Sequence, residues 1–236
     1  MKLCFFGDSI GKGIVYDAGR ERYVPSDSSF VRLIEQEQSC AVDNFSRFGC
    51  TVTRGAALIA KHTDSIEESD YVFLEFGGND SDFNWQEIAE EPEAVHNPRT
   101  PLDLFVSTYR KIVDGIRDLG KTPVILNLPP IDARKYFTRI SRGLSAENIL
   151  RWLGGDALYI YHWHEMYNAA VCAIGRATGA LLIDIRSAFL AKRNIADYLC
   201  EDGIHPNEQG HRLICDTLRN AADGSCCVSS PLALSC

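Results

Sequence analysis

The fold is decided by residues 1–13, which read MKLCFFGDSIGKG. The apolar run Leu3–Phe6 predicts a buried strand that stops at Gly7. Asp8 and Ser9 follow at once, where a parallel strand turns toward its crossover, and in open α/β sheets this carboxyl edge is where ligands bind. The Ser9 hydroxyl is therefore either a candidate nucleophile or part of a helix cap, because Ser and Asp are preferred capping residues.

Further apolar runs recur downstream, with helical patterns between them. The predicted strands are Ala41–Phe45, Tyr71–Phe76, Pro123–Asn127 and Ala180–Asp184, and the clearest helices run from a Thr100 cap to Leu119, from Leu158 to Thr178 and from Glu208 to Ala222. Continuous apolar runs indicate strands covered on both faces, hence a parallel sheet. The alternation predicts an α/β fold, a three-layer α/β/α sandwich around a central five-stranded parallel sheet.

Length and charge narrow the class of protein. The chain has 236 residues, which suits one α/β domain or two smaller ones. Its net charge of −8 argues against a nucleic-acid partner, because nucleic acids select for basic surfaces. No apolar run approaches the roughly 18 residues of a membrane span. The first residues do not have the pattern of a signal peptide, so we expect a cytoplasmic protein.

The cysteines and histidines form no metal or redox motif. The nine cysteines are scattered without CxxC spacing, and we expect reduced thiols. His162 and His164 are two residues apart, so on a helix they point about 200° away from each other and cannot bind one ion together. No metal and no cofactor is therefore predicted.

We expect residues 1–222 to form a single domain and residues 223–236 to form a C-terminal tail. Within the domain, residues 129–156 form an insertion at the carboxyl edge of the fourth strand, with a short helix over Ser145–Leu153. An insertion of this length is typical of a lid or a substrate wall. Four of its side chains either contact a polar or anionic part of a substrate or form a solvated surface: Arg134, Lys135, Tyr136 and Arg139.

A serine nucleophile needs a base, a group that orients the base, and donors for the oxyanion. Asp202-Gly-Ile-His205 precedes the last predicted helix and places a carboxylate three residues from an imidazole. The turn contains glycine, so the carboxylate can fold back on the ring and stabilise its charged form. The alternative is an ordinary polar turn in which Asn207 caps the helix.

Two further turns supply candidate oxyanion donors. Gly77-Gly78-Asn79-Asp80 directly follows the third strand, and the Asn79 amide can donate a hydrogen bond into the same crevice. Gly49 follows the second strand and offers a backbone N–H. Each segment also fits an ordinary turn, but the joint presence of nucleophile, base, orienting acid and donors favours a catalytic site.

These segments together resemble the four sequence blocks of the GDSL/SGNH hydrolases. The matching residues are Gly7–Ile10, Gly49, Gly77–Asp80 and Asp202–His205, in the family's order and over nearly the whole chain. The first block departs from the family's name-giving motif only in having Ile10 where that motif has Leu. The resemblance implies a flavodoxin-like fold.

The resemblance also implies roles for individual residues. Ser9 would be the nucleophile, His205 the base and Asp202 its orienting acid. The backbone N–H groups of Ser9 and Gly49 and the side chain of Asn79 would form the oxyanion hole.

Competing motifs in the first turn fit less well. Gly7-x-Ser9-x-Gly11 matches the nucleophile elbow of α/β-hydrolases, but that fold requires strands upstream of the serine and only eight residues precede Ser9. Gly11-Lys12 lacks the spacing and the following hydroxyl of a phosphate loop. A flavodoxin-like binding module remains an alternative, although it gives Asp202 and His205 no role.

The sequence therefore predicts a serine esterase that cleaves a carboxylic ester through an acyl-enzyme. The expected partner is a small-molecule ester with a small acyl or acetyl group, or a lysophospholipid. A carbohydrate O-acetylesterase and a thioesterase are the alternatives on the same site, and no oligomeric state is predicted.

Overall fold

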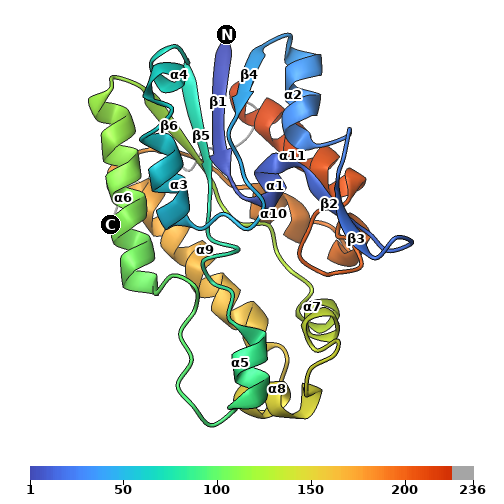
Figure 1. The fold of residues 1–236 in the computed structure, drawn as a ribbon. Coiled ribbons are helices and arrows are strands. Elements are labelled where there is room, and N and C mark those ends of the chain that lie inside the picture. Colours follow the sequence, from blue (N-terminus) through green and yellow to red (C-terminus); the bar gives the residue numbers. More distant parts are fainter. Residues whose placement is uncertain (225–236) are drawn as a thin grey trace, which may run out of the picture.

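A computed structural model describes residues 1–224 and builds them around a five-stranded parallel sheet (Figure 1). Its strands, in spatial order, are β4 (Ala41–Asn44), β1 (Lys2–Gly7), β5 (Tyr71–Glu75), β6 (Thr122–Leu126) and β7 (Leu181–Ile183). All neighbouring strands are parallel. In chain order they are the second, first, third, fourth and fifth strands, which is the flavodoxin-like arrangement. The predicted three-layer sandwich is confirmed.

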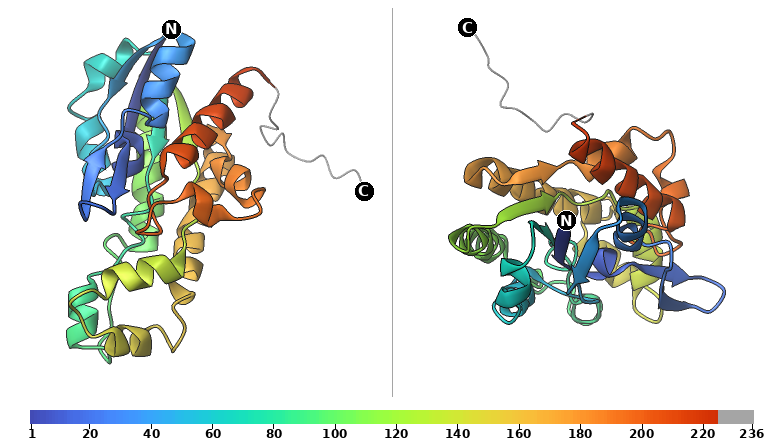
Figure 2. Two further views of the ribbon diagram at one scale, coloured as in Figure 1. Left: turned by 90° about the vertical axis from the view of Figure 1, so that its right-hand side faces the viewer. Right: turned by 90° about the horizontal axis from the view of Figure 1, so that it is seen from above.

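Alternate residues of β1 face two separate apolar cores. Leu3 and Phe5 belong to one core, and Cys4 and Phe6 belong to the other. The first core is closed by α2 (Phe30–Gln38), α10 (Ile185–Leu190) and α11 (Glu208–Ala222), and the second by α3 (Val52–Ile59), α6 (Leu102–Asp118) and α9 (Tyr159–Thr178). Figure 2 shows these helices on both sides of the sheet. Burial of both faces explains the continuous apolar runs in the sequence.

The long helices lie close to their predicted bounds. Helix α11 occupies the predicted span, and the Asn207 side chain accepts from the Gly210 N–H at 3.0 Å. The expected Thr100 cap of α6 was wrong, because Pro101 is the residue at the N-cap position. Thr100 is buried instead, and its N–H donates to the Asp80 carbonyl at 3.1 Å.

A β-hairpin that the sequence patterns do not predict follows the first turn. It pairs β2 (Ile14–Asp17) with β3 (Arg22–Pro25) in antiparallel register. The remaining short elements are α1 (Ser9–Lys12), α4 (Thr63–Glu67) and the 3₁₀ turn η1 (Ile195–Tyr198). Four-residue strands are too short for a reliable alternating pattern, so only the fold reveals this hairpin.

A third apolar cluster lies beyond the carboxyl edge of the sheet, at the bottom of Figure 1. It packs α5 (Trp85–Glu90), α7 (Ala133–Ile140) and α8 (Ala146–Trp152) against the start of α9. Helix α8 matches the short helix predicted within the insertion, and Ser145 caps it by accepting from the Asn148 N–H at 3.2 Å. The division into a domain over residues 1–222 and a tail stays a prediction, since residues 225–236 lie outside the described part of the chain.

Two kinds of feature are absent from residues 1–224: a helix that could span a bilayer and a cluster of metal ligands. None of the helices there is both long and apolar enough to span a bilayer. Nor do three or more His, Cys, Asp or Glu side chains gather in that part of the chain as they would to hold a metal ion.

Candidate active site

Ser9 is the first residue of α1, directly after β1 at the carboxyl edge of the sheet. The Asp8 side chain caps this short helix by accepting from the Ile10 N–H at 2.8 Å. Ser9 therefore does not cap the helix. Its own N–H lies in the first turn, where the backbone has no intrahelical acceptor.

A chain of two hydrogen bonds links the three residues predicted as a triad. His205 Nε2 lies 2.8 Å from Ser9 Oγ, and His205 Nδ1 lies 2.6 Å from Asp202 Oδ2. With the Nδ1 proton donated to Asp202, Nε2 is free to accept from the serine hydroxyl. The three side chains are buried, which protects these bonds from competing water.

The turn before α11 places the acid and the base. Asp202 Oδ1 accepts from the backbone N–H groups of Ile204 and His205, both at 3.2 Å. Between them Gly203 has φ of 79°, and a Cβ there would lie 2.6 Å from the Asp132 carbonyl oxygen. Only glycine fits this position, so the Asp-Gly pair serves the turn as well as the site.

The environment of Asp202 keeps it ionised. Burial by itself raises the pKa of this carboxyl, but the hydrogen bonds and positive charge of His205 outweigh burial and hold the pKa below its usual value. An ionised Asp202 can orient the imidazole and stabilise the imidazolium that forms when His205 takes a proton.

The three residues predicted to supply oxyanion donors, Ser9, Gly49 and Asn79, line one cavity together with His205. Asn79 Nδ2 donates one hydrogen to Asp8 Oδ2 at 2.8 Å, which leaves its second amide hydrogen available. Gly49 has φ of 66°, a left-handed conformation that turns the loop after β4 toward Asn79.

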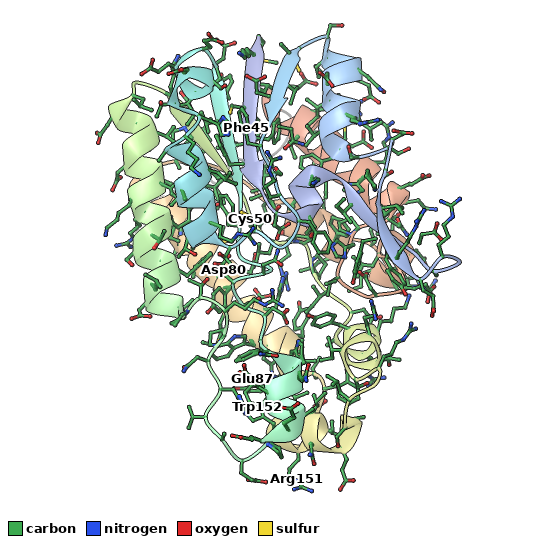
Figure 3. The ribbon with its side chains drawn as sticks, in the orientation of Figure 1. Phe45, Cys50, Asp80, Glu87, Arg151 and Trp152 are labelled. Carbon is green, nitrogen blue, oxygen red and sulfur yellow. The ribbon has the colours of Figure 1, made fainter. Side chains whose placement is uncertain are left out.

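Asp80 joins the loops that carry Gly49 and Asn79. Its two carboxylate oxygens accept from the Val52 N–H, at 2.9 and 3.1 Å, at the start of α3. Figure 3 shows Asp80 close to Cys50, which precedes α3. Burial, partly offset by a hydrogen bond from Thr100, raises the pKa of Asp80 to about 6.

Glu75 is a buried acidic residue that sequence reasoning missed. Its Oε2 accepts from the backbone N–H groups of Asp8 and Gly11, both at 3.3 Å, beneath the turn that carries Ser9. Burial, and then the charge of Asp8, raise the pKa of Glu75 well above its usual value. A signal was present, since a charged residue inside an apolar strand rarely lacks a specific partner.

Comparison with solved structures shows the fold. A lipase/acylhydrolase from Enterococcus faecalis superposes with a TM-score of 0.65 at 18% identity, covering 97% of this chain and 98% of that one. LAE5, an alpha/beta hydrolase enzyme from the metagenome of Lake Arreo, gives 0.65 at 22% identity and 95% of both chains. A mutant of Axe2, an acetyl-xylooligosaccharide esterase from Geobacillus, gives 0.62 at 20% identity, with 92% and 91% covered.

A comparison with curated proteins found no match. The model of the GDSL-like lipase/acylhydrolase family matches residues 5–213 of this chain. The chain belongs to this family. It is therefore a hydrolase of ester bonds, as the resemblance of its sequence blocks predicted.

The cavity of this GDSL-like hydrolase has a volume of about 440 Å³. Beyond the residues predicted as triad and oxyanion donors, its wall is rich in aromatic rings: Tyr23, Phe48, Phe83, Trp85, Tyr136, Trp152, Tyr159 and Trp163. Most of them come from the third apolar cluster and its neighbouring loops. The insertion of residues 129–156 contributes to this wall, so its predicted role as lid or substrate wall remains a hypothesis that fits the geometry.

One half-buried carboxylate, that of Asp82, organises the aromatic wall. Asp82 Oδ1 accepts from Trp85 Nε1 and from the Tyr136 hydroxyl, both at 2.8 Å, and Asp82 Oδ2 pairs with Arg99 at 3.1 Å. These bonds connect the loop after β5 to the insertion. Tyr136, one of the four insertion residues singled out from the sequence, is thereby part of the framework of the wall.

The other residues that the sequence singled out differ in whether they line the cavity or lie at the exposed surface. Arg139 and His164 line the cavity, whereas Arg134 and His162 are exposed. Burial, and then the charge of Arg186, lower the pKa of His164 to about 3, so this imidazole is neutral. Two aromatic residues without a sequence signal flank the base, since the Tyr23 and Phe48 rings lie 5.1 and 6.3 Å from the His205 ring.

Proposed function

We propose that this hydrolase is a serine esterase in which Ser9, His205 and Asp202 form the catalytic triad. The observation that carries the proposal is the pair of hydrogen bonds, 2.8 and 2.6 Å long, from Ser9 through His205 to Asp202. The acid is fully buried and the nucleophile opens onto a cavity. This is the arrangement that activates a serine hydroxyl near neutral pH.

The reaction follows from the geometry. His205 Nε2 takes the proton of Ser9 Oγ as this oxygen attacks the ester carbonyl carbon. The resulting oxyanion is bound by the N–H groups of Ser9 and Gly49 and by the Asn79 amide, and each donor contributes roughly 3 kcal/mol. The alcohol departs with the proton from His205, and water, activated by the same imidazole, releases the acid from Ser9.

The cavity favours a compact substrate. A volume of about 440 Å³ falls within the range of about 300–1,000 Å³ that is typical of small-molecule sites. We propose an ester with a small acyl group, and the aromatic wall fits the apolar faces of an alcohol part of moderate size. A sugar acetyl ester is a second candidate, because aromatic rings of this kind also stack on sugar rings and Axe2 is named as an acetyl-xylooligosaccharide esterase.

Active-site labelling tests the mechanism. We expect a fluorophosphonate probe to label the wild-type protein and not Ser9→Ala, and we expect Ser9→Ala to lose hydrolysis of p-nitrophenyl acetate. Ser81→Ala is a matched control, since Ser81 lines the cavity but its hydroxyl donates to the Gly78 carbonyl. A wild-type protein that neither reacts with the probe nor hydrolyses the ester would favour a binding module instead.

A second experiment compares a series of substrates to identify the ester that the enzyme prefers. Acetyl, butanoyl and longer esters of p-nitrophenol, acetylated sugars, a lysophospholipid and an acyl thioester are compared by kcat/KM. We expect the shortest oxygen esters to be the best of the simple series. A maximum at long acyl chains, or on the thioester, contradicts the assignment of a small acyl ester.

A further inference from the structure

Arg139 lies in the cavity wall close to the proposed base. It projects from α7, and its guanidinium carbon is 5.3 Å from the centroid of the Tyr16 ring and 5.9 Å from that of Tyr23. The Tyr23 ring in turn lies 5.1 Å from the His205 ring. One aromatic ring therefore separates a permanent positive charge from the imidazole.

Arg139 differs from the other arginines of this wall. Arg99 pairs with Asp82 at 3.1 Å, and Arg142 pairs with Glu21 at 3.1 Å. Among the described residues, Arg139 has no carboxylate within ion-pair distance, and its Nε is buried without a hydrogen-bond partner. A buried N–H without an acceptor costs free energy, and an acceptor on a ligand would offset this cost.

The carboxylates of the proposed active site already have partners. Asp202 is held by His205, and Asp8 accepts from the Ile10 N–H and the Asn79 amide. The guanidinium lies over the Tyr16 and Tyr23 rings. Burial raises the pKa of the Tyr23 phenol and the hydrogen bond and charge of Arg139 act to lower it, but a neutral phenol does not neutralise the charge. The described chain therefore supplies no carboxylate that pairs with Arg139, which leaves this charge for an anion that enters the cavity.

Other donors along the cavity are also unpartnered. The Trp163 and His164 side chains line the same cavity, and Trp163 Nε1 and His164 Nδ1 are buried without a hydrogen-bond partner. Because His164 is neutral, it can offer a hydrogen bond without adding charge. The wall therefore combines one uncompensated cation with neutral donors, which suits the oxygen atoms of an anion.

We propose that the natural substrate is an ester that also carries an oxyanion group, a carboxylate or a phosphate, and that Arg139 binds this group while Ser9 attacks the ester. The inference rests on the proposed esterase function and specifies its substrate class. The net charge of −8 would repel such a substrate from most of the surface. A local positive charge inside the cavity is then what favours its entry.

Matched ester pairs test the inference. On the alcohol side, p-acetoxybenzoate and p-acetoxyphenyl phosphate are each compared with phenyl acetate. On the acyl side, mono-p-nitrophenyl succinate is compared with p-nitrophenyl butanoate. In at least one of these pairs, we expect the anionic ester to have a higher kcat/KM than its neutral counterpart. We expect Arg139→Gln to reduce the ratio of anionic to neutral kcat/KM by about tenfold or more, because the loss of one charge-assisted hydrogen bond usually has an effect of this size.

Two variants serve as controls. Arg134→Gln removes an exposed charge from the same helix outside the cavity, and the ratio should stay as in the wild type. Arg139→Lys keeps the charge but loses the planar fork, so its ratio should lie between those of the wild type and Arg139→Gln. If the variants unfold, inhibition of the wild type provides a third readout. We expect p-hydroxybenzoate to inhibit more strongly than phenol, and we expect its inhibition to weaken as salt is added.

The outcomes are distinguishable. An active enzyme whose charge ratio is the same in the wild type and Arg139→Gln, or in which phenol inhibits as well as p-hydroxybenzoate, overturns the role of Arg139 and leaves the triad intact. A wild type that hydrolyses none of these esters and is not labelled at Ser9 by a fluorophosphonate overturns the esterase proposal itself.

Discussion

Glu75 and Asp8 are two carboxyl groups buried at the same edge of the sheet, where Glu75 Oε2 accepts from the Asp8 N–H at 3.3 Å. Burial raises the pKa of Asp8, and the hydrogen bonds that it accepts from the Ile10 N–H and the Asn79 amide partly offset burial, because they stabilise its charged form. Glu75 accepts only two longer bonds through Oε2, and its Oε1 meets no donor. The proton of the pair therefore belongs on Glu75, from where it can be donated to Asp8.

The first prediction concerns activity at this pair. Glu75→Gln should retain most of the wild-type kcat on p-nitrophenyl acetate, because an amide can donate to Asp8 and accept from the backbone as a protonated carboxyl does. Glu75→Leu should lower kcat by about tenfold or more with little change in KM, since Asp8 then loses a donor and Asn79 its fixed orientation. Equal damage by both substitutions would mean that the proton does not lie on Glu75.

The second prediction concerns stability against pH at the same residue. The Glu75 pKa is 4.5 in the unfolded chain and well above this in the fold. The stability that this carboxyl contributes is thus complete below about pH 4.5 and is lost as the pH rises. Relative to the wild type, the unfolding free energy of Glu75→Gln should rise with pH by up to about 1.4 kcal/mol per pH unit. Urea unfolding from about pH 5 to about pH 7 measures this difference, and a constant difference would contradict it.

A third prediction tests Asn79 as the proposed oxyanion donor. Asn79→Ala should reduce kcat by about 10²- to 10³-fold, because the charge that forms in the tetrahedral intermediate loses a preorganised donor. Asn84→Ala is the matched control, since Asn84 is exposed and its side chain makes no capping hydrogen bond. Steady-state kinetics of both variants on one ester measure the reduction in kcat. A loss shared by the two variants would point to general damage of the loop.

The fourth prediction tests the proposed acid of the triad. Asp202→Asn should lower kcat by about 10³- to 10⁴-fold, because an amide cannot stabilise the imidazolium and favours the wrong tautomer of His205. Asp216→Asn, on the exposed side of α11, should leave kcat unchanged. Circular dichroism of Asp202→Asn should match the wild type. A variant that folds normally and keeps its turnover removes Asp202 from the triad.

The fifth prediction concerns His211, which stacks on Phe30 outside the site. Burial, and then the charge of His205, lower the pKa of His211 from 6.5 to about 4. Its contribution to stability is therefore complete above about pH 6.5 and is lost as the pH falls toward 4. The stability of His211→Gln should fall less steeply, by up to about 1.4 kcal/mol per pH unit between about pH 6 and pH 5. His162→Gln, which removes an exposed histidine, should keep the wild-type slope.

Most residues of the candidate site could be predicted from the sequence because they lie on turns. Ser9, Gly49 and Asn79 each follow a strand of the parallel sheet, and such turns meet at one edge whatever their separation along the chain. Asp202 and His205 are close in sequence, so their contact is local. The bond from His205 to Ser9, 196 residues away, needed the order of the strands as well.

The cavity wall was less visible, because its contacts depend on packing between distant segments. Tyr23 comes from a hairpin with no clear pattern, and Asp82 reaches Tyr136 across 54 residues. Glu75 could have been suspected as a charge within a buried strand, but its partner Asp8 could not be named. Burial and hydrogen-bond geometry alone distinguish Arg139 from Arg134, which lies on the same helix.

The sequence by itself determined the five apolar strands, their helical crossovers and the turns that carry Ser9, Asn79 and His205, because periodicity and turn chemistry are local properties of the chain. Only the tertiary structure decided which proton-carrying groups touch: Ser9 with His205, Glu75 with Asp8, and Asp82 with Tyr136. The reason is physical. Desolvation and hydrogen bonding act over about 3 Å, and the strand order and the packing of the insertion set those distances.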